Sequence, residues 1–261
     1  MEFELAGKGA IVTGGSRGLG AAIAEALARE GMNLFLIARN KTKLKEVSAD
    51  IERRYGVGSS VHEADLTSIA EIDNATQAAI AALRSIDVLV NCAGATKRGD
   101  FFRLTDDDWE SGFGLKFFGA VRLSRALWPE LKKNGGSIIN IVGLGARMPS
   151  ADFTIGGSVN SALLNFTKAL AEIGIRDGIR VNAINPGFFQ TDRIAHTLRA
   201  EAERTGKPIE HAADALLTKL GVTRFGRSEE VGNLVAFIAS RQASYLNGAA
   251  IELDGGTRRN I

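Results

Sequence analysis

Short apolar runs alternate along this chain with longer stretches in which apolar residues recur every three or four positions. The short runs predict strands at 10–12, 33–37, 59–63, 86–90, 137–142, 181–185 and 250–253. The longer stretches predict helices at 19–30, 41–55, 69–84, 105–133, 157–175 and 228–239, with a polar and mostly helical stretch at 188–222. Because no hairpin signal separates the strands, the pattern predicts a doubly wound α/β domain, with a parallel sheet covered by helices on both faces.

Two of these helices carry signals for their first residues. Thr105 to Asp108 has the spacing of a capping box, and the aspartates there suit the positive end of a helix. Ser228 is expected to cap the helix that runs to Ala239.

Length, charge and composition narrow the class of protein. The 261 residues contain no linker, repeat or low-complexity segment, so we expect one domain over 1–261. The net charge of +2, with acids and bases interspersed, does not favour nucleic acid or a membrane surface as a partner. A single cysteine, Cys92, excludes an internal disulfide and fits a reducing compartment. No apolar run of about 18 residues and no signal peptide is visible, so we expect a soluble cytoplasmic protein.

The most informative stretch runs from Thr13 to Gly20, TGGSRGLG, between the first strand and the first helix. Gly14 permits a tight turn, Gly18 lets a phosphate approach the backbone, and Gly20 lets the helix pack closely on the strand. The free N–H groups of the first helical turn then face an anion. An ordinary glycine-rich turn remains the alternative for this motif alone.

Polar and small residues also follow the other predicted strands. In an open parallel sheet, ligands bind at the carboxyl ends of the strands, so these residues are the candidate site. They are Gly14–Gly20, Arg39, Asp65, Asn91–Gly94, Gly143 and the stretch 186–191.

These strand-end motifs resemble those of the short-chain dehydrogenase/reductase family. TGGSRGLG is similar to its cofactor motif, NCAG at 91–94 to its strand-four motif, and Pro186-Gly187 with Thr191 to its nicotinamide-side motif. RFG at 224–226, Glu229-Glu230, Asn247-Gly248 and DGG at 254–256 resemble its C-terminal signature. The likeness covers about 5–256 and implies a Rossmann fold whose variable substrate lid is 188–222. It implies cofactor contacts by Gly14, Ser16, Arg17, Gly18, Leu19, Gly20, Arg39, Asp65, Leu66, Asn91, Ala93, Gly94, Pro186, Gly187 and Thr191.

Within this resemblance, the residues near the ribose bear on the choice of nucleotide. An acid at position 38 would hold the 2′-hydroxyl of NAD(H), but Ala38 stands there, followed by Arg39, with Arg17 in the glycine turn. Two guanidiniums suit a 2′-phosphate, so NADP(H) is expected in preference to NAD(H). The alternatives are that both arginines are solvated, and that Asp65, which matches the family's adenine contact, is only a helix-capping loop residue.

The family's chemistry uses an asparagine, a serine, a tyrosine and a lysine, and the resemblance implies that all four are changed. Alignment on the family-like motifs that flank these positions puts Lys116 at the asparagine position, Gly143 at the serine, Gly156 at the tyrosine and Asn160 at the lysine. The nearest aromatic residue, Phe153, has no hydroxyl. The chain's two tyrosines lie elsewhere, at the end of an outer helix and in a C-terminal loop, where packing is the simple explanation.

Two catalytic hypotheses follow for this altered site. In one, Lys116 projects into the same cavity and polarises a carbonyl or donates a proton, with a pKa lowered by burial, while Asn160 bonds the ribose. In the other, Lys116 is structural or solvated. Ser158, Thr154, Asp152 and Arg147 lie in the same segment and rank lower as substitutes.

The remaining signals are weaker. The three histidines, His62, His196 and His211, have no metal-ligand spacing, so no metal is expected. In the lid, Arg193, His196, Arg199 and Arg204 are either contacts for an acidic substrate or a solvated helix face.

The sequence therefore leaves two functions open. One is an NADP(H)-dependent oxidoreductase acting on a small carbonyl or alcohol. The other is a catalytically silent cofactor-binding homologue that serves as a sensor, scaffold or oligomer partner. Family members usually form tetramers through the helices at 109–131 and 157–175, so a homotetramer or homodimer is expected.

Overall fold

A seven-stranded sheet forms the centre of the computed structural model, which describes residues 2–259. Within those residues the strand order is β3-β2-β1-β4-β5-β6-β7, and every neighbouring pair is parallel. The strands are β1 (Gly9–Thr13), β2 (Asn33–Ala38), β3 (Ser59–Glu63), β4 (Val88–Asn91), β5 (Ser137–Ile141), β6 (Arg180–Pro186) and β7 (Ala250–Leu253). This is the doubly wound Rossmann fold that the alternating pattern predicts.

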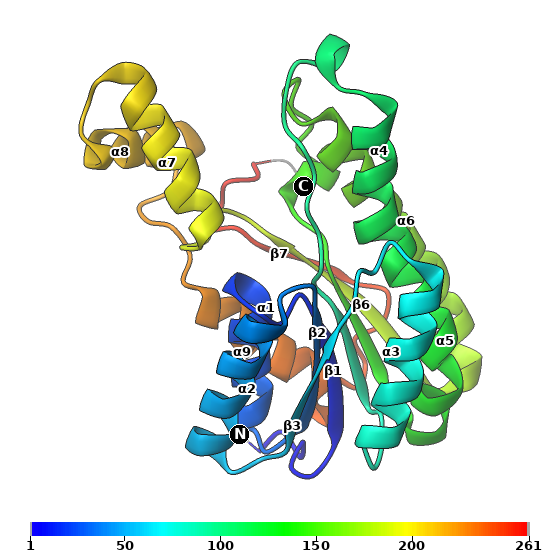
Figure 1. Cartoon of the computed structure of the whole chain (residues 1–261). Coiled ribbons are helices and arrows are strands. Elements are labelled where there is room, and N and C mark those ends of the chain that lie inside the picture. The colour runs from blue at the N-terminus through cyan, green and yellow to red at the C-terminus, as the bar shows by residue number, and fades with distance from the viewer. Residues whose placement is uncertain (1, 260–261) are drawn as a thin grey trace.

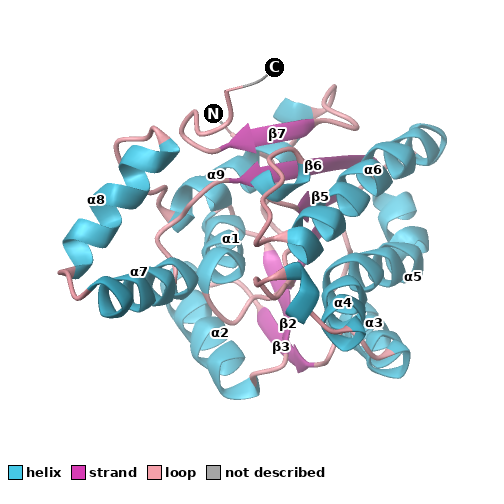
Figure 2. Ribbon diagram, turned by 90° about the horizontal axis from the view of Figure 1, so that it is seen from above, coloured by secondary structure: helices cyan, strands magenta, loops and turns pink. Residues whose placement is uncertain are grey.

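Helices cover both faces of this sheet (Figures 1 and 2). On one face lie α1 (Gly18–Arg29), α2 (Lys41–Tyr55) and α9 (Ser228–Ala239). On the other lie α3 (Ile69–Ala82), α4 (Asp106–Gly112), α5 (Gly119–Asn134) and α6 (Thr154–Asp177). Short 3₁₀ turns occur at Phe101–Arg103, Leu144–Ala146 and Arg241–Ala243.

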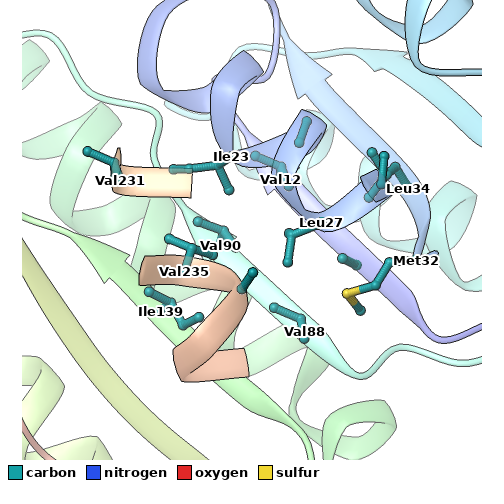
Figure 3. Packing of buried hydrophobic residues seen from close by; sticks show 14 of the residues in the cluster. Val12, Ile23, Leu27, Met32, Leu34, Val88, Val90, Ile139, Val231 and Val235 are labelled. Carbon is teal, nitrogen blue, oxygen red and sulfur yellow. The ribbon is translucent and has the colours of Figure 1, made fainter. Parts of the chain in front are cut away.

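The two-residue period of the strands divides the core between the two faces. Val12 and Val90 face α1 and α9, where they pack with Ile23 and Val235 in a fully buried cluster (Figure 3). Their neighbours Ile11 and Leu89 point the other way, into a second cluster that includes Leu123, Leu127 and Leu131 of α5. Each fully buried aliphatic side chain contributes about 1.5–3 kcal/mol, so the sheet and both helical layers are held as one unit.

The predicted lid region folds as two helices outside these layers. They are α7 (Asp192–Thr205) and α8 (Ile209–Leu220), which project beyond the carboxyl ends of the strands (Figure 1). Leu198, Ala212 and Phe225 form a small separate cluster beneath them. This placement fits a segment that covers a site at the strand ends.

The structure corrects several expected boundaries. The single helix expected at 105–133 consists of α4, a π-helical segment (Phe113–Phe118) and α5. α6 begins at Thr154 rather than at 157.

Two expected roles are also wrong. Ser228 is the first residue of α9 and donates to Gln190 O, while Glu230 accepts from the N–H of Arg227 at 2.7 Å. Packing does not explain Tyr245, whose side chain is fully exposed in this chain.

The capping box at Thr105 and Asp108 is confirmed by both of its hydrogen bonds. None of the helices in residues 2–259 combines the length and the apolar character needed to span a bilayer.

Candidate active site

The glycine turn after β1 places backbone where side chains would clash. Gly14 has φ +70°, and a Cβ built there would lie 3.2 Å from the backbone of Ala93. A Cβ on Gly20 would lie only 2.2 Å from the carbonyl oxygen of Gly14. Both positions therefore need glycine, one for a left-handed turn against the loop after β4 and the other for close packing of α1 on that turn.

The first turn of α1 is open to a ligand. Its N-cap residue, Arg17, makes no side-chain cap, and no acidic residue lies in the first turn. A Cβ built on Gly18 would lie 3.8 Å from a methyl of Thr191, and apart from its chain neighbours and its own helix nothing else in residues 2–259 comes within 4 Å. The uncapped N–H groups of this turn, beside half-buried Ser16 and Leu19, fit an anionic group such as a phosphate.

The side chains expected near the adenosine half of the cofactor are of two kinds, two exposed arginines and one aspartate that is hydrogen-bonded within its loop. Arg17 and Arg39 are exposed, and Arg17 lies 3.9 Å from Asp192 of the lid. Asp65 accepts hydrogen bonds from both N and Oγ1 of Thr67 at 2.9 Å, and the bond from the Thr67 backbone lowers the pKa of its carboxyl. Asp65 thus has a structural role in its loop, whether or not it also contacts adenine.

Two other predicted contacts face the protein interior. The side chain of Leu66 is buried in the core, so only its backbone is free to meet a nucleotide. Asn91 donates to Oδ1 of Asn140 at 2.9 Å, and Asn140 in turn donates to Thr167 Oγ1 at 2.9 Å. This buried chain of amides joins β4, β5 and α6 below the site.

Three loops meet beside the glycine turn. The N–H of Ala93 donates to Thr13 Oγ1 at 3.0 Å. Pro186 ends β6 fully buried, and a Cβ on Gly187 would lie 2.8 Å from the Cα of Asp254. Thr191 is the N-cap residue of α7 and faces Gly18. The structure therefore gathers Gly14, Gly18, Ala93 and Thr191, as expected for strand ends that share one edge.

Lys116 enters this site from the π-helical segment. Its stem lies against Gly94, since a Cβ built there would be 2.9 Å from Lys116 Cδ. Its Nζ donates to Oδ1 of Asn160 at 2.6 Å and to the carbonyl oxygen of Val142. Burial lowers the pKa of Lys116 to about 8, and the positive charge of Arg193 adds to this effect. Because an ammonium has three donors, one N–H is left beyond these two bonds.

The four positions singled out by the resemblance lie together. A Cβ on Gly143, which has φ +131°, would be 3.2 Å from Nδ2 of Asn160. Gly156 is covered by the ring of Phe153, because a Cβ there would lie 2.0 Å from the ring's Cζ. The guanidinium of Arg98 stacks over the face of this ring, 3.9 Å from its centroid. Their correspondence to the family's four catalytic positions stays a prediction.

The structure brings no phenol to Lys116 within residues 2–259. Tyr55 donates to Glu25 at 2.9 Å on the outer helices, and Tyr245 is exposed. Burial raises the pKa of the Cys92 thiol to about 12, so it is not a thiolate at neutral pH.

The substitutes that rank lower are engaged elsewhere or face solvent. Asp152 pairs with Arg98 at 2.9 Å, and Arg147 lies 3.6 Å from Glu252. Ser158 is exposed, while Thr154 Oγ1 is buried without a hydrogen-bond partner in the described chain. No cluster of three or more potential metal ligands occurs in residues 2–259.

Sequence reasoning missed three features of the site. The carbonyl of Val142 carries no side-chain signal, so its bond to Lys116 is visible only in three dimensions. The ring of Phe153 occupies the space over Gly156. The two residues are three apart at the start of a helix, and this spacing alone does not predict the contact. Arg193 donates across the site to Gly94 O at 3.2 Å, although its sequence context is that of a lid helix.

Comparison with known proteins identifies the family. Residues 14–258 match the family model described as enoyl-(acyl carrier protein) reductase. The chain is 33% identical over 260 residues to the 3-oxoacyl-[acyl-carrier-protein] reductase FabG of Aquifex aeolicus, covering 98% of this chain and 99% of that one. The chain belongs to the short-chain dehydrogenase/reductase family. It is also 32% identical to nodulation protein G of Rhizobium sp. over 97% of its length and 98% of the relative.

Solved structures of this short-chain dehydrogenase/reductase family superpose closely. The L-sorbose reductase of Gluconobacter frateurii, complexed with NADPH and L-sorbose, has a TM-score of 0.97 at 31% identity, with all of both chains covered. YwfH, an NADPH-dependent reductase involved in bacilysin biosynthesis, has a TM-score of 0.92 at 28% identity, covering 98% of this chain and all of the other. The whole described fold is therefore that of the family, lid helices included.

Proposed function

We propose that this protein is an NADP(H)-dependent oxidoreductase that interconverts a carbonyl and an alcohol, with Lys116 as the proton donor. One observation carries the proposal. The Lys116 amine lies between Asn160 and the Val142 carbonyl, at the point where the four predicted catalytic positions meet. Its lowered pKa, about 8, suits a group that gives up a proton near neutral pH.

The cofactor assignment rests on the glycine turn and on the relatives. The uncapped first turn of α1 and the open side of Gly18 suit a pyrophosphate, and exposed Arg17 and Arg39 suit a 2′-phosphate. Similar structures contain NADPH or NADP. When bound, the nicotinamide supplies a hydride to the carbonyl carbon or takes one from the alcohol. Gly94, Gly187 and Thr191 are proposed to hold that end.

The proposed chemistry of Lys116 follows from its hydrogen bonds. Two of its N–H groups point at Asn160 and Val142, which leaves the third for the oxygen of a substrate carbonyl. As that oxygen gains negative charge, it takes the third proton, and the neutral amine keeps both of its other hydrogen bonds. Lys116 as a whole residue is half-buried, and we propose that solvent returns the proton after each turnover. Oδ1 of Asn160 thus positions the donor, and its Nδ2 remains available to the ribose.

A catalytically silent binder is the second candidate, and one observation favours it. The hydrophobic ring of Phe153 fills the space over Gly156, and no phenol of the described chain replaces the usual proton donor. Under this proposal the protein binds the cofactor and acts as a sensor, scaffold or oligomer partner without turnover.

Two measurements separate these candidates. Titration of NADPH fluorescence tests the shared premise, and we expect binding below millimolar concentration. A panel of aldehydes, ketones and alcohols, assayed with excess protein, then tests turnover. We expect Lys116→Met to lower kcat by 10²–10⁴-fold while NADPH still binds, because general acid catalysis contributes about that much.

The matched control for this experiment is Lys133→Met. Lys133 is an exposed lysine that pairs with Glu130 near the end of α5, so its loss should leave kcat unchanged. Turnover that survives Lys116→Met would remove Lys116 from the mechanism. Absence of turnover with any substrate, together with NADPH binding, would favour the silent binder.

Assembly also remains a proposal. The aromatic residues Trp109, Phe113 and Phe118 of the segment 109–118, and Ile173 and Ile175 of α6, have surface that a second copy of the chain would cover. We propose a homotetramer or homodimer, which light scattering of the purified protein checks directly.

A further inference from the structure

Two cationic side chains from different elements meet at Gly94. The stem of Lys116 lies against its α-carbon, as the 2.9 Å approach of Cδ to a built Cβ shows. The guanidinium of Arg193, on the second residue of α7, donates to its carbonyl oxygen at 3.2 Å. Arg193 is close enough for its charge to help lower the pKa of Lys116. The lid therefore places a second positive charge beside the proposed proton donor.

The guanidinium of Arg193 bonds to a backbone carbonyl, and no carboxylate of the described chain lies within 4 Å of it. Its neighbour Asp192 pairs with Arg17 instead, at 3.9 Å. Three other cations near the site do have a carboxylate partner: Lys97 with Asp108, Arg98 with Asp152, and Arg147 with Glu252.

The hydrogen bond to Gly94 uses one of the N–H donors of the Arg193 guanidinium and leaves the others available. A guanidinium carries five N–H donors in one plane, and the structure gives this one a single carbonyl acceptor. A planar guanidinium with free N–H donors forms bidentate hydrogen bonds, two parallel N–H···O bonds, with a carboxylate. Because Arg193 and the stem of Lys116 both contact Gly94, an anion held by Arg193 would share the Gly94 loop with a carbonyl bound to Lys116.

From this arrangement we infer that the substrate is an oxo acid, whose carboxylate binds Arg193 while its carbonyl oxygen accepts from Lys116. The shared contact with Gly94 favours a short spacing between carboxylate and carbonyl, as in 2-oxo and 3-oxo carboxylates. This inference rests on the proposed function, in which Lys116 is the proton donor. Arg193 is then a specificity-determining residue that the lid delivers to the site.

The test compares acids with their uncharged analogues. With NADPH as reductant, kcat/KM is measured for 2-oxo and 3-oxo carboxylates of increasing chain length and for their methyl esters. We expect the acids to be preferred by at least tenfold. Arg193→Gln, which keeps the length and polarity but removes the charge, should lower kcat/KM for the acids by 10- to 100-fold and for the esters by less than twofold.

A matched control and a binding measurement complete the design. Arg176→Gln removes an arginine whose side chain is 81% exposed near the end of α6, and should change neither class of substrate. Calorimetry with malonate and with dimethyl malonate, in the presence of NADPH, reports recognition without turnover. Malonate should bind the wild-type protein and not Arg193→Gln, while the diester binds neither.

These measurements separate failure of the inference from failure of the proposed function. Malonate binding that depends on Arg193, without turnover of any carbonyl, would support the anion site and reject the enzyme. Equal use of acids and esters, or no binding of malonate, would overturn the inference. A raised NADPH Kd in Arg193→Gln, with acids and esters affected alike, would assign the guanidinium to the cofactor and overturn it as well.

Discussion

The Nζ of Lys116 lies 2.6 Å from Oδ1 of Asn160, so an amine from the π-helical segment and an amide from α6 form one hydrogen-bonded pair. An amide oxygen accepts from the ammonium and from the neutral amine alike, whereas a carboxylate would hold the proton in place. The pair therefore fixes the position of the amine without raising its pKa. This is the property that a proton donor near neutral pH requires.

The pH dependence of reduction should follow Lys116. The proton donor is the ammonium form, which predominates below the lowered pKa of about 8 and disappears above it. With a neutral ketone, kcat for reduction should be level at lower pH and fall about tenfold per pH unit above 8. Oxidation of the alcohol should show the opposite slope. A profile of kcat against pH checks this, and residual activity of Lys116→Met should lack the limb near pH 8.

Asn160→Asp should move that limb to higher pH. The substitution places a carboxylate at hydrogen-bonding distance from the Lys116 amine, and a nearby opposite charge stabilises the ammonium by roughly 1–3 pKa units. The same kcat profile measures the shift. A limb that stays near pH 8 in this variant would show that another group titrates there.

Removing both ribose-side arginines should change the choice of cofactor. Arg17 and Arg39 are exposed beside the glycine turn, and a charge-assisted hydrogen bond contributes about 1.5–3 kcal/mol. Arg17→Ala with Arg39→Ala should raise the Kd for NADPH by roughly 100-fold or more and leave that for NADH nearly unchanged. Fluorescence titration measures both constants. Arg125→Ala, at an exposed arginine of α5, is the control, and parallel loss of both cofactors would contradict the assignment.

Gly156→Ala should destabilise the protein through Phe153. The new methyl would lie 2.0 Å from the ring, and overpacking of this kind costs about 1–3 kcal/mol. In a Phe153→Ala background the same change should be neutral or stabilising by up to about 1 kcal/mol, because alanine favours the helix. Denaturant unfolding of the four proteins gives the coupling energy. Equal effects in both backgrounds would mean that the ring moves aside freely.

Arg180→Met should cost at least about 2 kcal/mol of stability, since hydrogen bonds to charged groups contribute about 1.5–3 kcal/mol. The guanidinium donates to the carbonyl oxygens of Ile238, Ala239, Ser240 and Ala243, which closes the end of α9 against β6. Burial lowers the pKa of Arg180 because the guanidinium loses its hydration. The four carbonyl acceptors replace the hydrogen bonds that water would otherwise make. Urea unfolding measures the loss, and the exposed Arg176→Met is expected to stay within about 0.5 kcal/mol.

The fold was largely predictable because its signals are local. Apolar runs, the glycine turn and the capping box at Thr105 depend on neighbouring residues, and all three appear in the structure. Helix ends and helix types were less predictable. The π-helical segment that contains Lys116 has no apolar period that distinguishes it from an α-helix. The hydroxyl of Ser228 donates to the carbonyl oxygen of Gln190 and does not cap its helix.

The site was predictable as a set of positions and not as a set of contacts. Strand order alone brings Gly14, Ala93 and Thr191 together, since parallel strands end at one edge. The partners of Lys116 depend on packing between the π-helical segment, β5 and α6, which are far apart in the chain. For Arg193 the sequence left open a contact with an acidic substrate and a solvated helix face, because nothing in its neighbourhood reveals the carbonyl of Gly94.

The ring that lies over Gly156 also constrains how this sequence is able to evolve. Any larger side chain at that position meets the ring of Phe153 before it reaches the cleft. A lineage with this pair therefore acquires a bulky group at 156 at lower cost once residue 153 has become smaller. The order of the two changes therefore matters, because the opposite order passes through an overpacked intermediate.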